Sequence, residues 1–276
     1  MGDKNTMSDE LIYDATQPMP RLLEIMRRLR DPNTGCPWDI EQTFETIAPY
    51  TIEEAYEVAD AISSGDMAGL EGELGDLLLQ TVYHAAIGEE AGHFTFITIA
   101  NAISDKMIAR HPHVFGDESR DKSAHQQTLD WEKQKALERT AKGEKGVLDG
   151  VALGLPALMR AAKLQKRAAR VGFDWDDIDK VMEKLREEAE ELTEARAQKD
   201  ADAIEDEMGD LLFVATNLAR HLDVDPEAAL RRTNDKFTRR FKYIEDTLKD
   251  SGDSIQNADL QKMDALWNEA KTLEKK

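Results

Sequence analysis

Apolar residues recur at the three- and four-residue spacing of amphipathic helices through most of this chain. A clear example runs from residue 18 to residue 29, after two opening prolines. Residues 94–100 alternate enough to resemble a strand, but Thr95 as an N-cap, followed by apolar residues at helical spacing, favours a helix. Asp225 before Pro226 predicts another helix start. The pattern predicts an all-α fold.

Two acidic pairs interrupt this pattern in the first half of the chain. Glu54 and Glu57 lie three residues apart, and so do Glu73 and Asp76, so each pair projects from one face of a helix. Turn-forming residues 63–66 separate the two helices, which should therefore run antiparallel. Four carboxylates then converge, which is unfavourable unless a cation neutralises them. Ligands that are all oxygen suit Mg²⁺ or Mn²⁺.

The same arrangement occurs again in the second half of the chain. Its predicted metal ligands are Glu188, Glu191, Glu207 and Asp210. Sixteen residues separate Glu57 from Glu73, and sixteen separate Glu191 from Glu207 (73 − 57 = 207 − 191). A solvated helix face would explain one such pair, but it gives no reason for a repeated spacing. The repeat predicts a leader at 1–17, a first repeat at 18–138, a linker at 139–154 and a second repeat at 155–276. We expect the leader to be disordered.

Composition narrows the class of partner. Charged residues make up 33% of the 276 positions and the formal net charge is −20, which argues against a nucleic-acid backbone as a general partner. Cys36 is the single cysteine, so no intrachain disulfide is possible, and this fits a reducing cytoplasm. No apolar run approaches the roughly 20 residues that a membrane span needs.

Each half also carries a Lys–Arg pair and a Trp–Lys pair, whose members lie four residues apart on one helix face. The pairs are Lys106–Arg110 and Trp131–Lys135 in the first half, and Lys236–Arg240 and Trp267–Lys271 in the second. A Lys–Arg pair at a helix C-terminus can serve the macrodipole alone, but opposite an acidic cluster we favour contact with phosphates. The Trp–Lys pairs fit a base and its phosphates, or plain packing. Trp38 could likewise stack on a base or cap the core.

Taken together, these motifs resemble the MazG-type nucleoside triphosphate pyrophosphohydrolases. The resemblance rests on the tandem Glu-Glu-x-x-Glu and Glu-x-x-Asp motifs, on the residues 36–39 before the first copy and on the residues 110–115 after it. It covers residues 18 to 274. One departure is Phe44, where the family pattern has a histidine.

The resemblance implies helical bundles formed across a homodimer, dependence on Mg²⁺, and cleavage of nucleoside triphosphates to monophosphate and pyrophosphate. It carries the metal-ligand role onto the eight acids named above. It also carries nucleotide contacts onto Lys236, Arg240, Trp267 and Lys271, with Lys184 near the phosphates. Attack at the α-phosphorus comes from the resemblance alone.

The chemistry follows from the residue types. A Mg²⁺ ion would join the triphosphate to the carboxylates and activate water. No serine, cysteine or histidine is placed as a nucleophile, so we favour direct attack by water. Glu53 and Glu187, beside the ligands, are candidates to orient or deprotonate it, and the predicted catalytic residues are Glu187, Glu188, Glu191 and Glu53.

A His-Asp phosphohydrolase and a ferritin-like di-iron bundle are two alternatives that do not fit the sequence. A His-Asp phosphohydrolase needs an adjacent His-Asp pair, and none of the six histidines is followed by aspartate. A ferritin-like di-iron bundle needs Glu-x-x-His in its acidic motif, and neither copy of the motif here has it. A non-catalytic helical module that binds nucleotide or metal for regulation stays open as the alternative function. The second repeat has Lys184 where the first has Tyr50, and this extra positive charge predicts that the second repeat is the more active.

Overall fold

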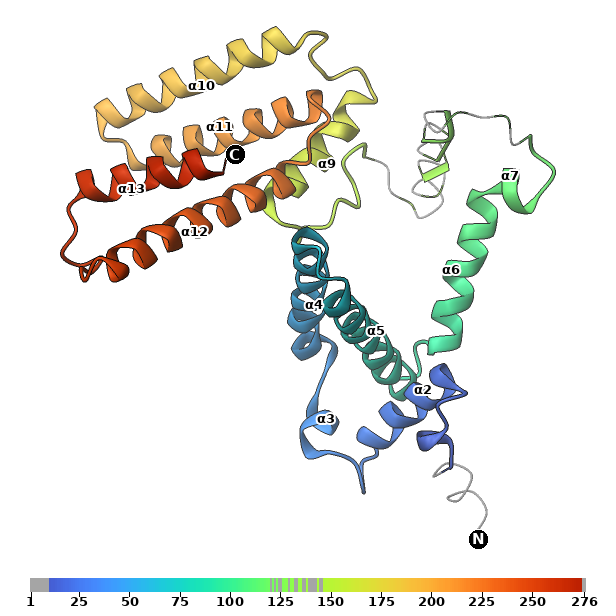
Figure 1. Cartoon of the computed structure of the whole chain (residues 1–276). Coiled ribbons are helices and arrows are strands. Elements are labelled where there is room, and N and C mark those ends of the chain that lie inside the picture. Colours follow the sequence, from blue (N-terminus) through green and yellow to red (C-terminus); the bar gives the residue numbers. More distant parts are fainter. Residues whose placement is uncertain are drawn as a thin grey trace. The chain divides into compact units, whose positions relative to one another are not determined.

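The computed structural model describes residues 10–119, 121, 123, 126–128, 130, 131, 134, 135, 138, 143 and 146–274. The described residues are helices, turns and irregular segments, and they contain no strand, which confirms the predicted all-α class (Figure 1). The chain divides into two compact units, Met1–Glu132 and Lys133–Lys276. None of the described helices is long and apolar enough to cross a bilayer.

The first unit is built on a helical hairpin. Its helices are α2 (Pro18–Leu29), α3 (Pro37–Glu41), α4 (Phe44–Ser64), α5 (Met67–Glu90), α6 (Phe96–Arg110) and α7 (Pro112–Phe115). Helices α4 and α5 pack side by side, and α2 packs against α5 (Figure 1). The buried core between them contains Met26, Ile47, Val82, Tyr83 and Ile87.

The predicted turn joins the two helices of this hairpin. Ser63 and Ser64 form the end of α4, and Gly65 follows in the left-handed conformation with φ of 75°. Asp66 then caps α5 by accepting a hydrogen bond from the Gly69 amide. Thr95 caps α6 in the same way, so residues 96–110 are a helix, as its predicted N-cap indicated.

A buried arginine fixes the loop that leads into α4. The Arg30 side chain is 8% exposed and forms an ion pair of 2.6 Å with Glu90. It also donates to the Asp39 carbonyl, and the Tyr83 hydroxyl donates to the Asp39 carboxylate at 2.9 Å. Burial, together with Asp39, raises the pKa of Tyr83 to about 12. Trp38 stays 52% exposed on this loop, so it does not cap the core.

The second unit repeats the hairpin and adds another. Its helices are α9 (Ala157–Ala169), α10 (Ile178–Gln198), α11 (Ala201–His221), α12 (Pro226–Asp250) and α13 (Leu260–Leu273). Helix α10 packs against α11, α12 packs against α13, and α9 lies against α11 and α12. Lys199, with φ of 59°, and Asp200 form the turn between α10 and α11, at the places of Gly65 and Asp66 in the first hairpin.

Two helix boundaries of this unit are the start of α12 and the end of α9. Asp225 caps α12 by accepting from the Ala228 amide at 2.8 Å, as predicted. Helix α9 follows Pro156 and ends at Ala169. The residues after it form turns, and Gly172 has φ of 87°.

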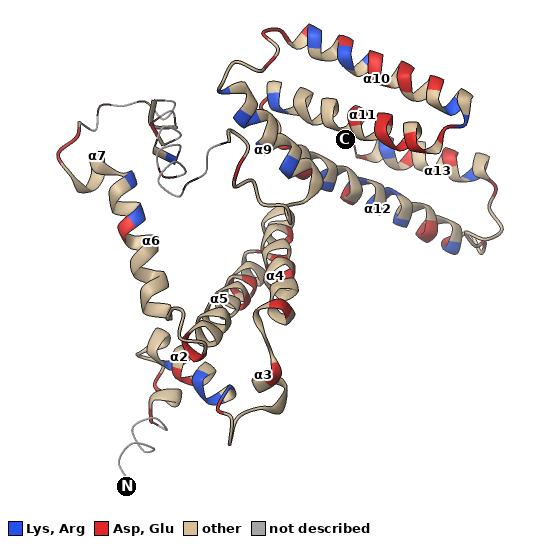
Figure 2. Cartoon of the chain, turned by 180° about the vertical axis from the view of Figure 1, so that it is seen from behind, with Lys and Arg blue, Asp and Glu red and all other residues tan. Residues whose placement is uncertain are grey.

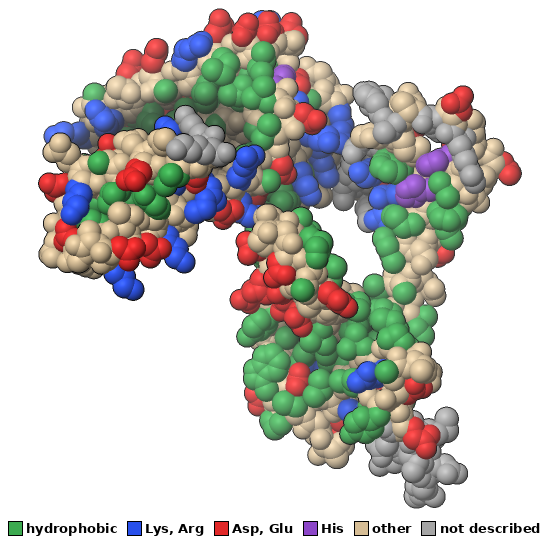
Figure 3. Space-filling model, in the orientation of Figure 1, with side chains coloured by type: hydrophobic (Ala, Val, Ile, Leu, Met, Phe, Trp, Pro, Cys, Tyr) green, Lys and Arg blue, Asp and Glu red, His purple; other side chains and the backbone are tan. Residues whose placement is uncertain are grey.

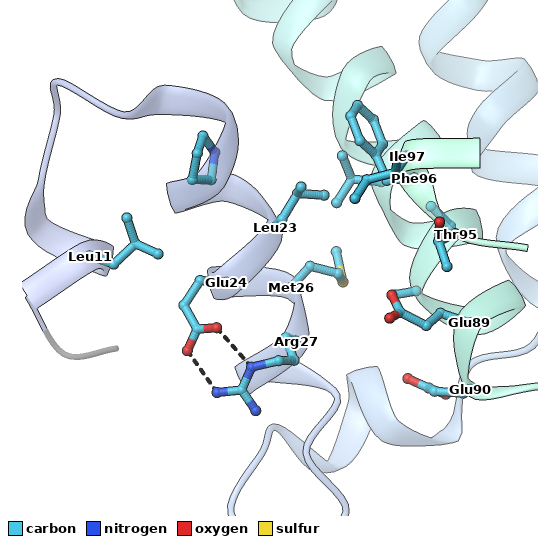
Figure 4. A pocket seen from close by; sticks show the side chains of 14 residues that line it. Leu11, Leu23, Glu24, Met26, Arg27, Glu89, Glu90, Thr95, Phe96 and Ile97 are labelled. Atoms are coloured by element: carbon cyan, nitrogen blue, oxygen red, sulfur yellow. Dashed lines mark hydrogen bonds and ion pairs between the residues drawn. The ribbon is translucent and has the colours of Figure 1, made fainter. Parts of the chain in front are cut away.

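The ends of the predicted domains are less completely described. Residues 10–13 are helical, whereas residues 1–9 of the expected leader lie outside the described residues. Leu11 lines a cavity of about 480 Å³ between α2, α5 and the start of α6 (Figure 4). Most of the expected linker before residue 146 also lies outside the described residues, so the domain limits stay predictions.

Candidate metal and nucleotide sites

The α4–α5 hairpin brings three of its four predicted ligands together. Glu54, Glu57 and Glu73 each offer a carboxylate oxygen, and these oxygens lie within 4.8 Å of one another. Burial raises the pKa of Glu54, and the charges of Asp76 and Glu57 raise it further. Burial and the same kind of repulsion raise the pKa of Glu73. Asp76 is therefore close enough to act on the cluster, although it is not one of the three converging groups.

The α10–α11 hairpin forms the second cluster from Glu188, Glu207 and Asp210, again with oxygens within 4.8 Å of one another. Figure 2 shows acidic residues on both hairpins. Burial raises the pKa of Glu207, and Glu188 and Asp210 add to the shift. The fourth predicted ligand, Glu191, lies beside these three. Burial raises the pKa of Glu191, Lys184 opposes this shift, and Glu188 and Glu207 add to it.

Lys184 lies at the second acidic cluster and pairs with its acids. Its Nζ lies 2.8 Å from Glu187 Oε1 and 2.8 Å from Glu188 Oε1, and it lies 3.9 Å from Glu191 Oε2. The hydrogen bonds to Glu187 and Glu188 raise the pKa of Lys184. Because Lys184 and Glu188 are four residues apart on α10, the contact is a local one. The lysine therefore supplies part of the positive charge that this cluster requires.

The donor set of both clusters fits a hard divalent cation. Converging oxygens with raised pKa values show that the carboxylates repel one another in the absence of a cation. Oxygen ligands without cysteine or histidine suit Mg²⁺ or Mn²⁺ better than Zn²⁺. The residues present could thus hold a metal ion on each hairpin.

The predicted general bases differ in their surroundings. Glu53 is exposed on α4, next to the cluster residue Glu54. Glu187 is also exposed, but its carboxylate accepts a hydrogen bond of 2.8 Å from Lys184. One oxygen of the Glu187 carboxylate is therefore already engaged by Lys184.

The basic and aromatic residues of the second unit form a separate group. The Arg240 guanidinium lies 5.3 Å from the centre of the Trp267 ring. Helices α12 and α13 therefore bring together one residue from each of the two predicted pairs. Arg240 also pairs with Glu274 at 2.6 Å, and Arg239 pairs with the same carboxylate at 2.8 Å. Hydrogen bonds from Arg240 lower the pKa of Glu274. This pairing could not be predicted from the sequence, because Glu274 lies 34 residues from Arg240.

Lys236 and Lys271 make no ion pair within the part of the chain that the structure describes. Lys236 is half-buried on α12, and Lys271 is exposed on α13. Neither contacts the acidic cluster of α10 and α11. Their predicted contacts with phosphate therefore stay predictions.

In the first repeat, Trp131 and Arg110 are in contact at the end of α6. The Trp131 indole donates to the Arg110 carbonyl at 3.0 Å and packs edge-on against His111. Helix α6 ends at Arg110, and α7 follows as one further helical turn. Lys106 is exposed on α6, and Lys135 is half-buried.

The cavity shown in Figure 4 is not part of either site. It is lined mainly by apolar side chains of α2, α5 and α6, with Glu89 and Glu90 among its few polar ones. Val82 is the first α5 residue to line it, nine positions beyond Glu73, which places it about 14 Å farther along the helix. No described lining residue has a buried side-chain nitrogen or oxygen without a partner.

Two helical hairpins with matching carboxylate clusters define an all-α protein with paired candidate sites for a divalent metal. Comparison with known proteins then identifies the family. The MazG nucleotide pyrophosphohydrolase domain matches the chain twice, at residues 42–115 and 177–244. The chain belongs to the MazG family. This result confirms the resemblance found in the motifs, including the duplication.

Two relatives that match over nearly their whole length carry names that agree with the domain. The nucleoside triphosphate pyrophosphohydrolase of Escherichia coli (strain K12) is 51% identical over 256 residues, which cover 92% of this chain and 97% of the relative. The Thermotoga maritima protein named nucleoside triphosphate pyrophosphohydrolase/pyrophosphatase MazG is 43% identical and covers 91% of this chain and 94% of its own length. The Bacillus subtilis protein YabN is 46% identical over 91% of this chain, which spans 51% of YabN.

Proposed function

We propose that this chain hydrolyses nucleoside triphosphates to the monophosphate and pyrophosphate, with Mg²⁺ as its cofactor. The observation that carries the proposal is the convergence of three carboxylate oxygens on each hairpin of a tandem MazG chain. The names of the relatives that match nearly end to end support the same reaction. The chain is therefore a hydrolase acting on phosphoric anhydrides.

In the second repeat, Glu188, Glu207 and Asp210 would hold the metal, with Glu191 beside them. A bound Mg²⁺ would supply Lewis-acid stabilisation of the phosphoryl oxygens and would lower the pKa of a nearby water. A cation at this position competes with Lys184 for Glu188. We therefore infer that Lys184 leaves Glu188 when the site is loaded, and that its ammonium group then pairs with the triphosphate.

The departure of Lys184 also changes Glu187. Its carboxylate loses a hydrogen bond and becomes available to accept the proton of the attacking water. Glu53 is the equivalent residue of the first repeat: it lies three positions after Tyr50, as Glu187 lies three positions after Lys184. In this proposal, Lys236 and Arg240 stabilise charge on the departing pyrophosphate, and Arg240 exchanges Glu274 for phosphate. Lys106 and Arg110 would do the same in the first repeat.

We also propose a homodimer. Large apolar side chains are exposed beside the clusters: Leu74 is 50% exposed and Leu78 is 38% exposed on α5, and Leu212 is 51% exposed on α11. Figure 3 shows hydrophobic side chains gathered over the first unit, next to a group of acidic ones. Helices that are apolar on several sides need neighbours on several sides. Light scattering should give about twice the 31.1 kDa of one chain, and a mass of one chain at micromolar concentration would refute the dimer.

A pyrophosphate assay separates the enzyme from a regulatory module that only binds nucleotide. The purified protein with Mg²⁺ should release pyrophosphate and monophosphate from several triphosphates, and EDTA should stop the reaction. Release of inorganic phosphate and a diphosphate would contradict attack at the α-phosphorus. Nucleotide binding without turnover at any substrate would favour the module. A cytoplasmic location and the domain limits 18–138 and 155–276 belong to the same proposal.

A further inference from the structure

The stretch of chain that contains α9 is free of acidic residues. No aspartate or glutamate occurs between Asp149 and Asp174, a run of 24 positions (174 − 149 − 1), although acidic residues make up 56 of the 276 positions of the chain. The run contains five basic residues: Arg160, Lys163, Lys166, Arg167 and Arg170. This part of the second unit is therefore locally positive in a chain whose formal net charge is −20.

Helix α9 and its helical C-cap residue Arg170 gather these five residues on one side, which we call the basic face. At about 100° per residue, the five residues occupy an arc of about 120° around the helix axis and span about 15 Å along it. The opposite side carries the buried residues Ala161 and Gln165, and Gln165 donates to the Phe213 carbonyl of α11. Lys163, at the centre of the arc, is exposed, and Figure 2 shows basic residues along α9.

Three residues of the basic face carry positive charge that the described part of the chain does not neutralise. Arg160, Lys163 and Lys166 form no ion pair with any residue that the structure describes. Lys163 and Lys166 are both exposed. These groups are therefore available to an anionic partner.

The corresponding helix of the first unit differs in this respect. Helix α2 packs against α5 as α9 packs against α11, and it also carries arginines. Glu24 pairs with Arg27 at 2.7 Å and with Arg28 at 3.0 Å, and Glu90 pairs with Arg30 at 2.6 Å. The first unit thus supplies acids for these arginines, whereas α9 has none. An unpaired basic face is therefore not a requirement of the repeated fold.

An apolar pocket opens beside the basic face. It has a volume of about 260 Å³, and its apolar lining comes from α9, from α11 and from the segments on either side of α9: Leu148, Leu164, Ala168, Phe173, Trp175 and Phe213. Four large side chains of this lining are exposed: Phe173 at 80%, Leu148 at 47%, Phe213 at 41% and Trp175 at 37%. Large apolar side chains exposed around one cavity mark a place where a partner docks.

The pocket and the basic face share an edge. Leu164 lines the pocket and lies four residues after Arg160 and three residues before Arg167, so it is a neighbour of both on the helix surface. An apolar centre with a charged rim is the usual anatomy of a protein–protein interface, in which a large side chain of one partner fills a pocket of the other. Sites for whole small molecules usually have volumes of about 300–1,000 Å³, so a pocket of about 260 Å³ suits a single side chain.

We propose that this surface docks an acidic peptide segment of another protein, with one large apolar side chain in the pocket and carboxylates on the basic face. Charge complementarity selects this class of partner, because Arg160, Lys163 and Lys166 have no acid of their own to pair with. The pairing acts within a Debye length of about 8 Å, so distant acids of the chain oppose it little. This inference does not depend on the proposed hydrolysis.

A nucleic-acid strand fits the same surface less well. Proteins that bind single strands offer successive aromatic platforms along the backbone, whereas the rings here surround one pocket. A strand that extends beyond the basic face would also meet the negative charge of the rest of the chain.

The test uses a fluorescein-labelled peptide of about ten residues, with one central phenylalanine between glutamates and aspartates. Two matched peptides replace the phenylalanine by serine, or every acid by its amide. Fluorescence anisotropy of the full chain in EDTA measures binding that no metal ion can mediate. The probe should bind with a Kd in the micromolar range, and each matched peptide should bind about fivefold or more weakly. No binding of the probe, or equal binding of the amide peptide, would overturn the proposal.

Lys163→Glu combined with Lys166→Glu tests the basic face. The control combines Lys242→Glu with Lys249→Glu, which changes the net charge equally at two exposed lysines of α12. The first variant should weaken binding of the probe by about tenfold or more, and the control should weaken it by less than about twofold. Equal losses in the two variants would mean that only net charge matters, and the docking surface would be refuted.

Phe173→Ser tests the pocket, and Leu260→Ser at the start of α13, where the side chain is 79% exposed, is its control. Phe173→Ser should weaken binding of the probe by about fivefold, but it should leave the serine peptide unaffected, because that peptide has no ring to place in the pocket. An equal loss for both peptides, or an equal loss in Leu260→Ser, would contradict the pocket assignment.

Two competitors and one mass measurement decide between this partner and the other occupants. Neither ATP in EDTA nor a single-stranded oligonucleotide of about ten nucleotides should displace the probe. Displacement by ATP would make the surface part of the nucleotide site, and displacement by the oligonucleotide would make it a nucleic-acid site. Light scattering of the variant with Lys163→Glu and Lys166→Glu should give the wild-type mass, since a lower mass would make this face a contact between copies of the chain. Each of these contrary results overturns the proposal.

Discussion

The two acidic clusters share their spacing but differ in what balances their charge. In the second hairpin, Lys184 forms ion pairs with Glu187 and Glu188. In the first hairpin, the equivalent residue is Tyr50 (184 − 50 = 134, and 188 − 54 = 134), which carries no charge at neutral pH. The first cluster therefore carries the greater net negative charge before any ligand arrives, and the second is partly neutralised by the protein itself.

Because of this difference in charge, we expect the two clusters to differ in their affinities for a free metal ion and for a nucleotide. A more negative cluster attracts a free divalent cation more strongly, whereas a cluster with its own lysine repels it and attracts a triphosphate. We expect the first repeat to bind metal in the absence of nucleotide. We expect the second repeat to bind metal mainly together with its nucleotide, and to be the more active of the two.

Loss of a cluster acid should have the largest effect. Glu207→Ala in the second repeat should lower kcat for pyrophosphate release by roughly 10- to 100-fold or more, the range seen for damage to a metal site. Glu73→Ala, its counterpart at the same position of the first hairpin, should retain a substantial fraction of the activity. A steady-state assay over a panel of nucleotides checks both, and a greater loss in Glu73→Ala would reverse the ranking of the repeats.

Exchange of the residue that balances the clusters should have the next largest effect. Lys184→Gln should raise the affinity of the second site for Mn²⁺ without nucleotide by about tenfold, because a competing cation is gone, and should lower kcat/KM. Tyr50→Lys should weaken Mn²⁺ binding at the first site. Electron paramagnetic resonance of free Mn²⁺ measures both. Equal Mn²⁺ affinities in the wild type and in both variants would remove the basis of the comparison.

Release of Arg240 from Glu274 should have a smaller effect. Glu274→Gln frees Arg239 and Arg240 for phosphate, so KM should fall by about two- to fivefold while kcat stays nearly constant. Asp253→Asn, which breaks the 2.6 Å pair with Lys262 elsewhere in the same unit, is the control and should leave KM unchanged. A rise of KM in Glu274→Gln would mean that the ion pair positions Arg240 for the substrate.

The smallest expected effect is the pH dependence of His84. Burial lowers its pKa below the ordinary 6.5, so the unfolded chain takes up a proton before the folded chain does. Stability should therefore decline as the pH falls through 6.5. His84→Leu, which copies Leu218 of the second repeat, should flatten this decline in thermal melts of metal-free protein. Thr51 keeps its bond to the Ile47 carbonyl when its 2.9 Å contact with His84 is lost.

Features that depend on short-range pattern could be predicted from the sequence. The N-caps at Thr95 and Asp225 were predicted because a capping residue acts on amides two or three positions away. The clusters were predicted because residues three apart share a helix face and a turn of fixed length joins the helices.

Features that depend on tertiary contact could not be predicted. The pairing of Glu274 with Arg240 joins two helices across a long separation in sequence. The apolar pocket beside α9 forms only when α9 packs against α11, where Gln165 donates to the Phe213 carbonyl 48 residues away.

The left-handed residue between the helices of each hairpin marks the point from which the acids of the second helix are counted, and this count decides whether they face the acids of the first helix. Gly65 and Lys199 each end one helix, and the aspartate that follows each of them begins the next. Each helical residue turns the chain by about 100°, so a residue inserted between the capping aspartate and the acids of α5 or α11 would rotate those acids away from the cluster. Two carboxylates would then leave the cluster without either being mutated. The number of residues from the turn to the acids is thus as necessary to the candidate metal site as the acids are.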